Sequence, residues 1–284
     1  MKKIKVIKFG GTSLRTKEDR NEVIEILKEE SKQAKIVVIV SAMGRYPEPY
    51  ATDTLLKLAP KLSLKETDQL LSCGEIISRH VLCNECIIEG LSCKSLNILE
   101  NGIKTNRQYG NGTAIFVDTN DLYHALDLYQ IVIVPGFFGT NDDHYPTSLG
   151  RGGSDLSAIL IADSLGLKEV TIYSDVKGIY SADPKVVREA KLYEEVNVIQ
   201  ALLLAKLNVP VLQKKACEMA LKRNITMILK STFNKNGYTI VNKKAAYHTF
   251  LVKKENGYFL IDSYNRIKKF DSNLTINQAH RLFV

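Results

Sequence analysis

Short apolar runs and amphipathic segments alternate along the first part of the chain. Ile4 to Lys8 and Ile36 to Ala42 are rich in β-branched residues and end in turns that contain Gly or Ser, which is typical of buried parallel strands. Between them, Lys17 to Glu30 carries apolar residues at i, i+3 and i+4 from Val23, which predicts a helix. A strand, a crossover helix and a second strand form a βαβ unit. The pattern therefore predicts an α/β fold with a mainly parallel central sheet sandwiched by helices.

A second series of elements follows in the middle of the chain. We expect strands at 131–134, 169–173 and 225–230, and helices at 154–165, 197–206 and 213–223, with a polar loop at 140–150. After about Asn242 the pattern changes, because 249–253 and 258–262 are typical of a hairpin around Glu255-Asn256-Gly257. Residues 243–284 are therefore predicted to form a small basic appendix to the preceding 242 residues.

Composition places the chain among globular proteins. It has 284 residues, of which 45% are hydrophobic and 25% charged. The basic N-terminus is interrupted by Lys5 and Lys8, and no long apolar run follows, so we expect neither a signal peptide nor a membrane span. The odd number of cysteines, five, predicts reduced thiols and a cytoplasmic location. Cys83 and Cys86 form a lone CxxC, for which two buried helix cysteines are favoured over a metal or redox site.

Positive charge gathers near the C-terminus. Residues 233–284 hold nine Lys or Arg against three acidic residues, which accounts for +6 of the formal charge of +8. Such a segment either binds an anionic partner or presents a solvated polar surface. We favour the solvated surface and expect no nucleic-acid partner, because no RNA- or DNA-binding motif accompanies the charge.

Two glycine-rich turns carry candidate phosphate chemistry. In Lys8-Phe9-Gly10-Gly11, a lysine ends a strand and two glycines let backbone N–H groups approach a polyphosphate. Neither GxGxxG nor the GxxxxGK[ST] motif is present. A structural turn would explain the two glycines equally well.

The second turn, Gly150-Arg151-Gly152-Gly153-Ser154-Asp155, opens a predicted helix and again directs amide donors toward an anion. The Arg151 fork suits a carboxylate, although Ser154 or Asp155 could simply cap the helix. The strand at 169–173 then runs into a loop rich in hydroxyls and acids, residues 174–185, which could hold a nucleotide base and ribose.

Four motifs occur together and in order: KFGGTS at 8–13, SAMGR at 41–45 with TDTLL at 52–56, GRGGSD at 150–155, and SDVKGIYSADPK at 174–185. With SCGE at 72–75 and PGFFG at 135–139, they resemble the aspartokinases of the amino-acid kinase family over roughly residues 1 to 240. The resemblance implies the amino-acid kinase fold with two lobes. It assigns about 1–145 to the substrate lobe and 146–242 to the nucleotide lobe.

The resemblance also implies site residues. Lys8 and Asp155 are the expected catalytic residues, the lysine neutralising the transferring phosphoryl group and the aspartate orienting the lysine. The expected substrate-binding residues are Ser41, Thr52, Glu75, Phe137, Arg151 and Ser154. Glu75 would hold the substrate ammonium and Arg151 its α-carboxylate. The expected nucleotide-binding residues are Lys8, Gly10, Gly11, Ser174, Asp175, Tyr180 and Lys185.

The implied reaction is phosphorylation of the L-aspartate side chain by ATP, which begins lysine and threonine biosynthesis. The acceptor carboxylate, with a pKa near about 4, is ionised at neutral pH and needs no histidine base. We expect lysine, backbone dipoles and an ATP-bound Mg²⁺, held mainly by the phosphates, to stabilise the charge. Glutamate or another small acidic amino acid is an alternative substrate.

Some positions depart from the family pattern. Pro210 stands where members commonly have a lysine near the nucleotide, and we hypothesise that Lys206 or Lys214 supplies the missing charge. Gln200 and Leu203 replace usual glutamates, which supports the alternative of a non-catalytic paralogue. Only about forty residues follow the kinase region, which predicts a reduced regulatory module and activity indifferent to lysine and threonine. A homodimer or a regulatory subunit is the expected partner.

Overall fold

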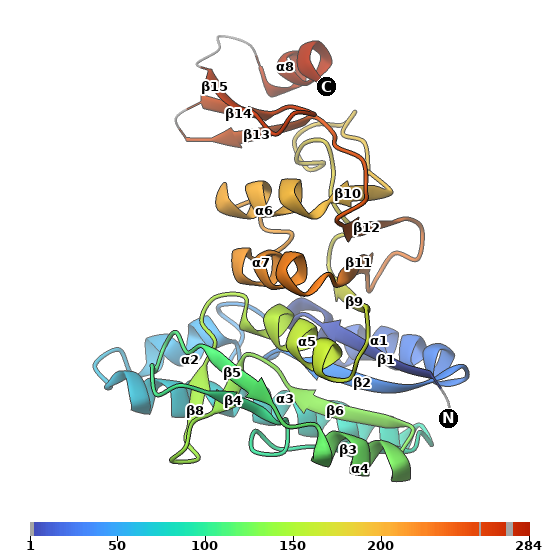
Figure 1. Ribbon diagram of the computed structural model, residues 1–284, viewed down its shortest axis with the longest axis vertical. Coiled ribbons are helices and arrows are strands. Elements are labelled where there is room, and N and C mark those ends of the chain that lie inside the picture. Colours follow the sequence, from blue (N-terminus) through green and yellow to red (C-terminus); the bar gives the residue numbers. More distant parts are fainter. Residues whose placement is uncertain (1–2, 256, 271–274) are drawn as a thin grey trace.

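The computed structural model describes residues 3–255, 257–270 and 275–284. An eight-stranded sheet extends through the molecule in the order β10-β12-β11-β9-β1-β2-β6-β3 (Figure 1). The strands are β1 (Lys3–Phe9), β2 (Ala34–Val40), β3 (Cys93–Ser95), β6 (Ile131–Pro135), β9 (Glu169–Ser174), β10 (Glu195–Asn197), β11 (Thr226–Ser231) and β12 (Tyr238–Asn242). Its neighbouring strands are parallel except for β11 and β12. The predicted α/β class with a mainly parallel sheet is confirmed.

Helices cover both faces of this sheet, and α8 (Ile276–Phe283) packs instead on β13 near the C-terminus. The other helices are the 3-10 helix η1 (Gly11–Leu14), α1 (Lys17–Ser31), α2 (Thr52–Leu58), α3 (Leu64–Ile88), α4 (Asn120–Leu128), α5 (Gly153–Ser164), α6 (Val198–Lys206) and α7 (Lys214–Arg223). Capping boxes fix the starts of α1 and α3, where Thr16 and Ser63 each bond reciprocally with an acid three residues later. The helices predicted at 17–30, 154–165, 197–206 and 213–223 are thus confirmed within one residue at each end.

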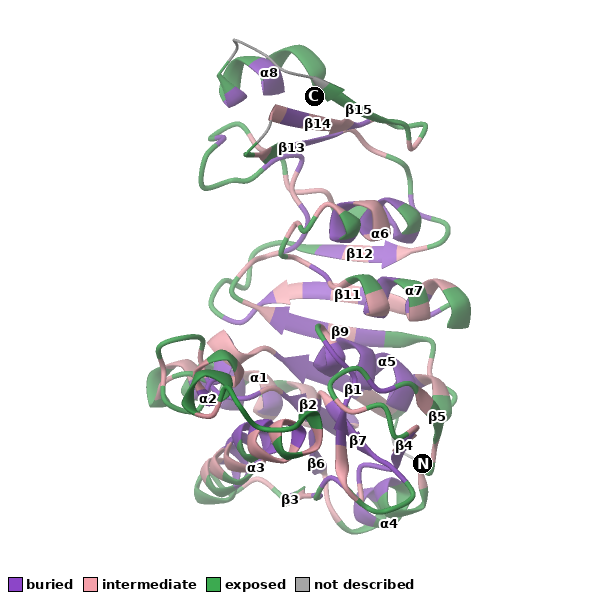
Figure 2. Ribbon diagram, turned by 90° about the vertical axis from the view of Figure 1, so that its left-hand side faces the viewer, coloured by how far each residue is buried: buried purple, intermediate pink, exposed green. Residues whose placement is uncertain are grey.

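The central strands are buried on both faces because alternate side chains enter different cores (Figure 2). In β2, Ile36, Val38 and Val40 pack with α1 and α3. Val37 and Ile39 belong to the opposite cluster, which includes α5, α6 and α7. This double burial explains why the sequence of β2 is an uninterrupted apolar run.

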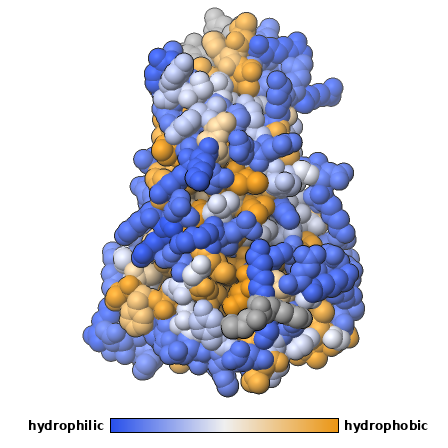
Figure 3. All heavy atoms as spheres, turned by 45° about the vertical axis from the view of Figure 1, so that its right-hand side comes forward, coloured by the Kyte–Doolittle hydropathy of each residue, from blue (hydrophilic) through white to orange (hydrophobic). Residues whose placement is uncertain are grey.

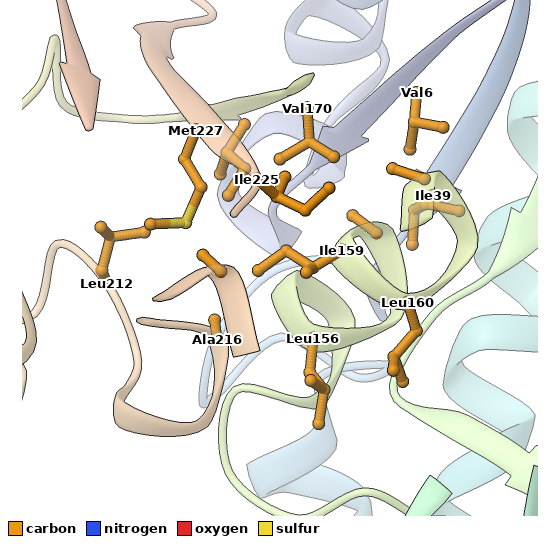
Figure 4. Close-up of a cluster of buried hydrophobic side chains, with 14 of the residues drawn as sticks. Val6, Ile39, Leu156, Ile159, Leu160, Val170, Leu212, Ala216, Ile225 and Met227 are labelled. Atoms are coloured by element: carbon orange, nitrogen blue, oxygen red, sulfur yellow. The ribbon is translucent and has the colours of Figure 1, made fainter. Parts of the chain in front are cut away.

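Helix α5 joins the two halves of the sheet. Ile159 and Leu160 of α5 belong to one cluster with Val6, Ile39 and Val170, and Figure 4 shows Ile159 on the side of α5 that faces the strands. Residues 1–145 and 146–242 therefore share one sheet and one core, and the division into a substrate lobe and a nucleotide lobe is not a boundary in packing. The assignment of those lobes stays a prediction.

Two smaller sheets complete the fold. One contains β5 (Ala114–Val117), β4 (Ile103–Thr105), β7 (Phe138–Thr140) and β8 (Pro146–Ser148). The sequence did not predict this sheet, and β8 lies in the segment expected to be a polar loop. The other contains β13 (Phe250–Lys254), β14 (Gly257–Ile261) and β15 (Ile267–Phe270). The predicted hairpin is β13 and β14, although Asn256 of its turn lies outside the described residues.

We call residues 243–284 the C-terminal segment. It packs on the chain around Ala182 and Val187, where Leu251 and Ala279 join a small apolar cluster. Gln200 on α6 holds the start of the segment, because its amide donates to the His248 carbonyl at 2.7 Å and accepts from the His248 N–H at 2.8 Å. Hydrophilic residues cover most of the face seen in Figure 3, and apolar residues reach it in separate patches.

Candidate functional site

The candidate site lies at the carboxyl edge of the central strands. Strand order runs outward from β1 in both directions, with β9 on one side and β2 on the other. Crevices at such a reversal are where ligands bind in open α/β sheets. Phe9, Val40, Pro135 and Ser174 end their strands at this edge. The loops that follow these residues carry the predicted site residues.

Lys8 and Asp155 meet at this edge of the sheet. Lys8 Nζ lies 2.7 Å from Asp155 Oδ1, and both residues are more than nine-tenths buried. Asp155 occupies the first turn of α5, where the helix dipole favours a negative charge. Oδ1 has this charge contact but no hydrogen bond among the described residues. The aspartate therefore fixes the lysine ammonium at the edge of the sheet without an aligned hydrogen bond.

The glycine turn after β1 is tightly packed. A Cβ on Gly11 would lie 2.6 Å from the carbonyl oxygens of both Ala42 and Gly44, so that position requires glycine. The Gly10 N–H donates to the Tyr173 carbonyl at 3.1 Å, which means that it is already occupied. The amides that open η1, at Gly11 and Thr12, have no partner within their helix. They are the donors best suited to an anion at this turn.

Glu75 presents an unusual carboxyl group on α3. It is 1% exposed, and its Oε1 accepts from the Ala42 N–H at 3.2 Å. Its Oε2 is buried without a hydrogen-bond partner. Burial raises the pKa of this carboxyl from its ordinary 4.5 to about 8, although the Ala42 N–H opposes the shift. A buried orphan acceptor of this kind suits a cationic ligand, which would restore the missing contact and the negative charge.

The loops between β6 and α5 bring two more predicted residues together. Gly136 packs closely against α5, since a Cβ at this position would lie 3.0 Å from the Ser154 Cβ. Phe137 has a φ of 68° and donates its N–H to Ser157 Oγ at 3.1 Å. Arg151 is exposed in the turn before α5, where its guanidinium is free to reach a ligand carboxylate. Phe137, Arg151 and Ser154 thus border one side of the crevice.

Ser41 and Thr52 lie in the stretch of chain that follows β2. Ser41 follows β2 directly, and its N–H donates to the Phe9 carbonyl at 3.3 Å. Ser41 precedes Ala42, whose N–H donates to the buried Glu75 carboxyl. Thr52 begins α2, whose first amides face outward from the helix. Both residues are positioned to contact a small polar molecule near Glu75.

Two residues that the sequence did not predict hold these loops in place. Asp68 on α3 is 1% exposed and its Oδ2 accepts from the N–H groups of Gly110 and Ser148, each at 2.9 Å. Lys215 on α7 donates to Asn111 Oδ1 and to the Leu149 carbonyl, and burial lowers its pKa. Only the fold brings these groups together, although an acid on the buried face of a helix was a signal available in the sequence.

Lys8, Gly10 and Gly11 lie at the end of β1, and the other four predicted nucleotide-binding residues fall in two further places. Ser174 and Asp175 lie at the end of β9, where Asp175 pairs with Arg45 Nη2 at 3.3 Å. Arg45 thereby links the SAMGR loop to the nucleotide side, a role that sequence reasoning missed. Tyr180 and Lys185 instead line a cavity of about 420 Å³ farther along the same loop, together with Pro210. This lining includes neither Lys206 nor Lys214, and the ammonium of the exposed Lys214 pairs with Glu218 at 3.7 Å.

The cysteines and the acidic residues form no evident metal centre. Cys83 and Cys86 are buried on α3, which confirms the prediction of buried helix cysteines. Across the described ranges, no group of three or more His, Cys, Asp or Glu side chains is arranged to hold a metal ion. In the same residues, no helix is long and apolar enough to cross a membrane.

The chain thus combines a mainly parallel sheet with a buried lysine–aspartate pair at its carboxyl edge. Residues 3–231 match the model of the amino acid kinase family, and the chain belongs to that family. It is 36% identical over 244 residues to aspartokinase 1 of Bacillus subtilis (strain 168), covering 84% of this chain and 60% of that protein. The chain thus spans about three fifths of the length of this relative.

Solved structures agree with this assignment. The aspartate kinase of Synechocystis is 30% identical, with a TM-score of 0.73, covering 84% of this chain and 40% of that one. Aspartokinase III of E. coli, in complex with aspartate and ADP, has a TM-score of 0.74 at 24% identity, covering 88% of this chain and 67% of that one. The latter likeness supports the fold.

Proposed function

We propose that the chain is an aspartokinase, which transfers the γ-phosphoryl group of ATP to the side-chain carboxylate of L-aspartate and forms 4-phospho-L-aspartate and ADP. The observation that carries the proposal is the buried pair of Lys8 and Asp155 at the carboxyl edge of the sheet. The aspartokinase relatives, among them a structure with aspartate and ADP, supply the substrate class.

The chemical step needs charge stabilisation rather than a base. A carboxylate oxygen of aspartate bonds to the γ-phosphorus as the bond from that phosphorus to the β–γ bridging oxygen breaks, and ADP leaves with the electron pair. No proton moves, because the acceptor is already ionised. Lys8 neutralises charge on the transferring group, while Asp155 keeps the ammonium in position.

The aspartate would bind between Glu75 and Arg151. The unpaired Glu75 oxygen receives the substrate ammonium, which also favours ionisation of this carboxyl. Arg151 pairs with the α-carboxylate in the forked geometry of a guanidinium. Hydroxyl groups of Ser41, Thr52 and Ser154, with the Phe137 backbone, complete the pocket around the acceptor side chain.

ATP would extend from the turn after β1 along the loop after β9. The amides of Gly11 and Thr12 suit its phosphates, and Ser174, Asp175, Tyr180 and Lys185 lie along its ribose and base. A magnesium ion bound to the phosphates would supply further charge neutralisation. Asp155 and Asp175 would be its protein carboxylates, and because they also pair with Lys8 and Arg45, the phosphate oxygens would hold most of the ion.

An acyl-hydroxamate assay tests this proposal. With ATP, Mg²⁺ and hydroxylamine, we expect product with L-aspartate and little with L-glutamate. Lys8→Ala should lower kcat by about a hundredfold or more, the usual effect of losing one electrostatic contact to a transition state. Lys5→Ala is the matched control, because Lys5 is on the same strand but pairs with Glu30 at the surface. Equal turnover by Lys8→Ala and wild type would contradict the assigned role.

The same assay separates catalysis from the alternative of a non-catalytic paralogue. No turnover with either acid would favour the paralogue, which drew support from Gln200 and Leu203. Gln200, however, has a structural reason to be an amide. It bonds both the carbonyl and the N–H of His248, and a carboxylate could not donate to that carbonyl. This substitution therefore serves the attachment of the C-terminal segment and carries no sign of lost catalysis.

A further inference from the structure

A cavity of about 420 Å³ lies where the C-terminal segment meets the kinase domain. Most of its lining comes from three parts of the chain: the loop 176–186 after β9, the connection 208–211 between α6 and α7, and the whole of β13. Leu204 of α6 and Ile276 of α8 complete it. Its volume is within the range of small-molecule sites, which is about 300–1,000 Å³. The strand β13 is thus a wall of a ligand-sized space that begins in the predicted nucleotide loop.

The chemistry of the lining favours a ligand with an apolar face and an anionic group. Ile179, Leu204, Val211 and Val252 give the cavity apolar walls. The charged residues in the lining are three lysines, Lys185, Lys253 and Lys254, against one aspartate, Asp183. Asp183 is already used locally, because its Oδ1 accepts from the Lys185 N–H at 2.9 Å.

Lys254 is the best placed of these cations. Its side chain is half-buried, and its Nζ donates to the carbonyl oxygen of Asn208, another lining residue, at 3.4 Å. Asn208 has a φ of 53° and precedes Val209 and the uncharged Pro210 in the connection between α6 and α7. Lys254 of β13 therefore places a positive charge beside this connection, which supplies none itself.

The fold holds β13 firmly on the nucleotide side. The Leu251 N–H donates to the Ser181 carbonyl at 2.8 Å, and the Ser181 hydroxyl lies 2.9 Å from His280 Nε2 on α8. Arg281 on α8 also pairs with Glu189 at 2.7 Å. These contacts fix Lys254 relative to Tyr180 and Lys185, so its position does not depend on a flexible tail.

We propose that β13 is part of the nucleotide site and that Lys254 binds the nucleotide. The apolar walls would hold the base, and Lys254 would contact the ribose-phosphate portion. This inference rests on the proposed function, because it takes ATP as the ligand that enters along the loop after β9. It replaces the hypothesis that Lys206 or Lys214 supplies the charge absent at Pro210.

Calorimetric titration of the full chain with MgADP tests the inference. Lys254→Ala should raise the Kd for MgADP about three- to tenfold, which is the effect of losing one charge-assisted contact that is partly open to solvent. Lys254→Glu should raise it further because repulsion replaces attraction. In the hydroxamate assay, KM for ATP should rise in parallel, with kcat and the KM for aspartate unchanged.

Lys269→Ala is the matched control. Lys269 belongs to the same three-stranded sheet, on β15, but is exposed and does not line the cavity. We expect the control to bind MgADP like the wild type. Thermal melts of all three variants should match the wild type, which excludes loss of folding as the cause.

The outcomes distinguish this inference from the proposed function. If wild type binds MgADP but forms no hydroxamate, the proposed function fails and the Kd values still decide the role of Lys254. If wild type is active and both Lys254 variants bind MgADP normally, the inference is overturned and the proposed function stands. Absence of saturable MgADP binding by wild type would overturn both.

Discussion

At the scale of single residues, Glu75 connects stability, pH and substrate binding. Its carboxyl is fully buried with one unpaired oxygen, so the folded protein retains a proton on this group up to a pKa of about 8. The unfolded chain releases the same proton near its ordinary pKa of 4.5. Ionisation in the folded state is unfavourable until a cationic ligand arrives.

Because of this proton, we expect the difference in free energy of unfolding between wild type and Glu75→Gln to depend on pH. Between about pH 4.5 and 8 the folded wild type binds more protons than the unfolded chain, so its stability falls as pH rises through this window. The variant lacks that contribution, so the free energy of unfolding of wild type minus that of Glu75→Gln should decrease from pH 4.5 to 8. The upper limit is about 5 kcal/mol, because one pKa unit corresponds to about 1.4 kcal/mol.

Urea denaturation of both proteins at several pH values measures the difference. The exposed Glu22→Gln serves as the control and should show no such trend relative to wild type. A constant difference between wild type and Glu75→Gln across this range would contradict the raised pKa.

In the hydroxamate assay, KM for aspartate should also fall from pH 7 toward pH 9 as Glu75 ionises more easily.

At the scale of elements, α3 organises the substrate side. This helix of 25 residues presents Glu75 to the loop after β2 and Asp68 to the loops before α5. Its buried face also carries Cys83 and Cys86, which pack with α1 and the sheet. The helix therefore connects the hydrophobic core with the crevice, and a change at one buried acid affects a loop far away in the sequence.

Removing the Asp68 carboxylate tests that connection. Asp68→Ala leaves the buried N–H of Ser148 and the N–H of Gly110 without their acceptor. Each unsatisfied group costs about 1–3 kcal/mol, so we expect a loss of roughly 2–5 kcal/mol in the free energy of unfolding.

Urea denaturation gives the value, and Asp68→Asn should recover part of it because the amide oxygen still accepts. Asp53→Ala, at an exposed position of α2, is the control. A loss below about 0.5 kcal/mol in Asp68→Ala, as expected for an ordinary surface substitution, would show that these bonds do not fix the loops.

At the scale of the whole molecule, the C-terminal segment and the kinase domain form one structure. Leu251 and His280 both contact Ser181, and Gln200 fixes the residues that lead into β13. The cavity enclosed by these contacts lies beside the predicted nucleotide loop. Ligand binding there should therefore stabilise part of the C-terminal segment, which lies outside the matched family region, 3–231.

Hydrogen exchange followed by mass spectrometry measures this effect. MgADP should slow amide exchange in β13, at 250–254, because a ligand in the cavity favours the closed state of its walls. Exchange in β15, at 267–270, serves as the internal control, since this strand does not line the cavity. Equal protection of both strands, or of neither, would argue against binding at β13.

The sequence alone was sufficient for the order of the motifs and for five strands of the main sheet, β1, β2, β6, β9 and β11, but not for β3, β10 and β12. Buried parallel strands must be apolar on both faces, so β1, β2 and β6 were visible as β-branched runs that end in turns. Helices α1, α5, α6 and α7 followed from spacing and caps. Lys8, within β1, and Asp155, in the first turn of α5, were predicted from the resemblance of their motifs, because each motif is a local pattern.

The tertiary structure decided what local pattern cannot encode. Strands of three residues, such as β7 and β8, carry too little periodicity to be predicted, and their sheet forms only through pairing with distant strands. The bond from the Ala42 N–H to Glu75, the bonds of Asp68 and the contact of Arg45 with Asp175 join residues that are 33 to 130 positions apart. The same holds for Lys254, whose place beside Asn208 depends on how the C-terminal segment folds back. Sequence spacing specifies which residues share an element, whereas burial and charge at a site depend on which elements pack together.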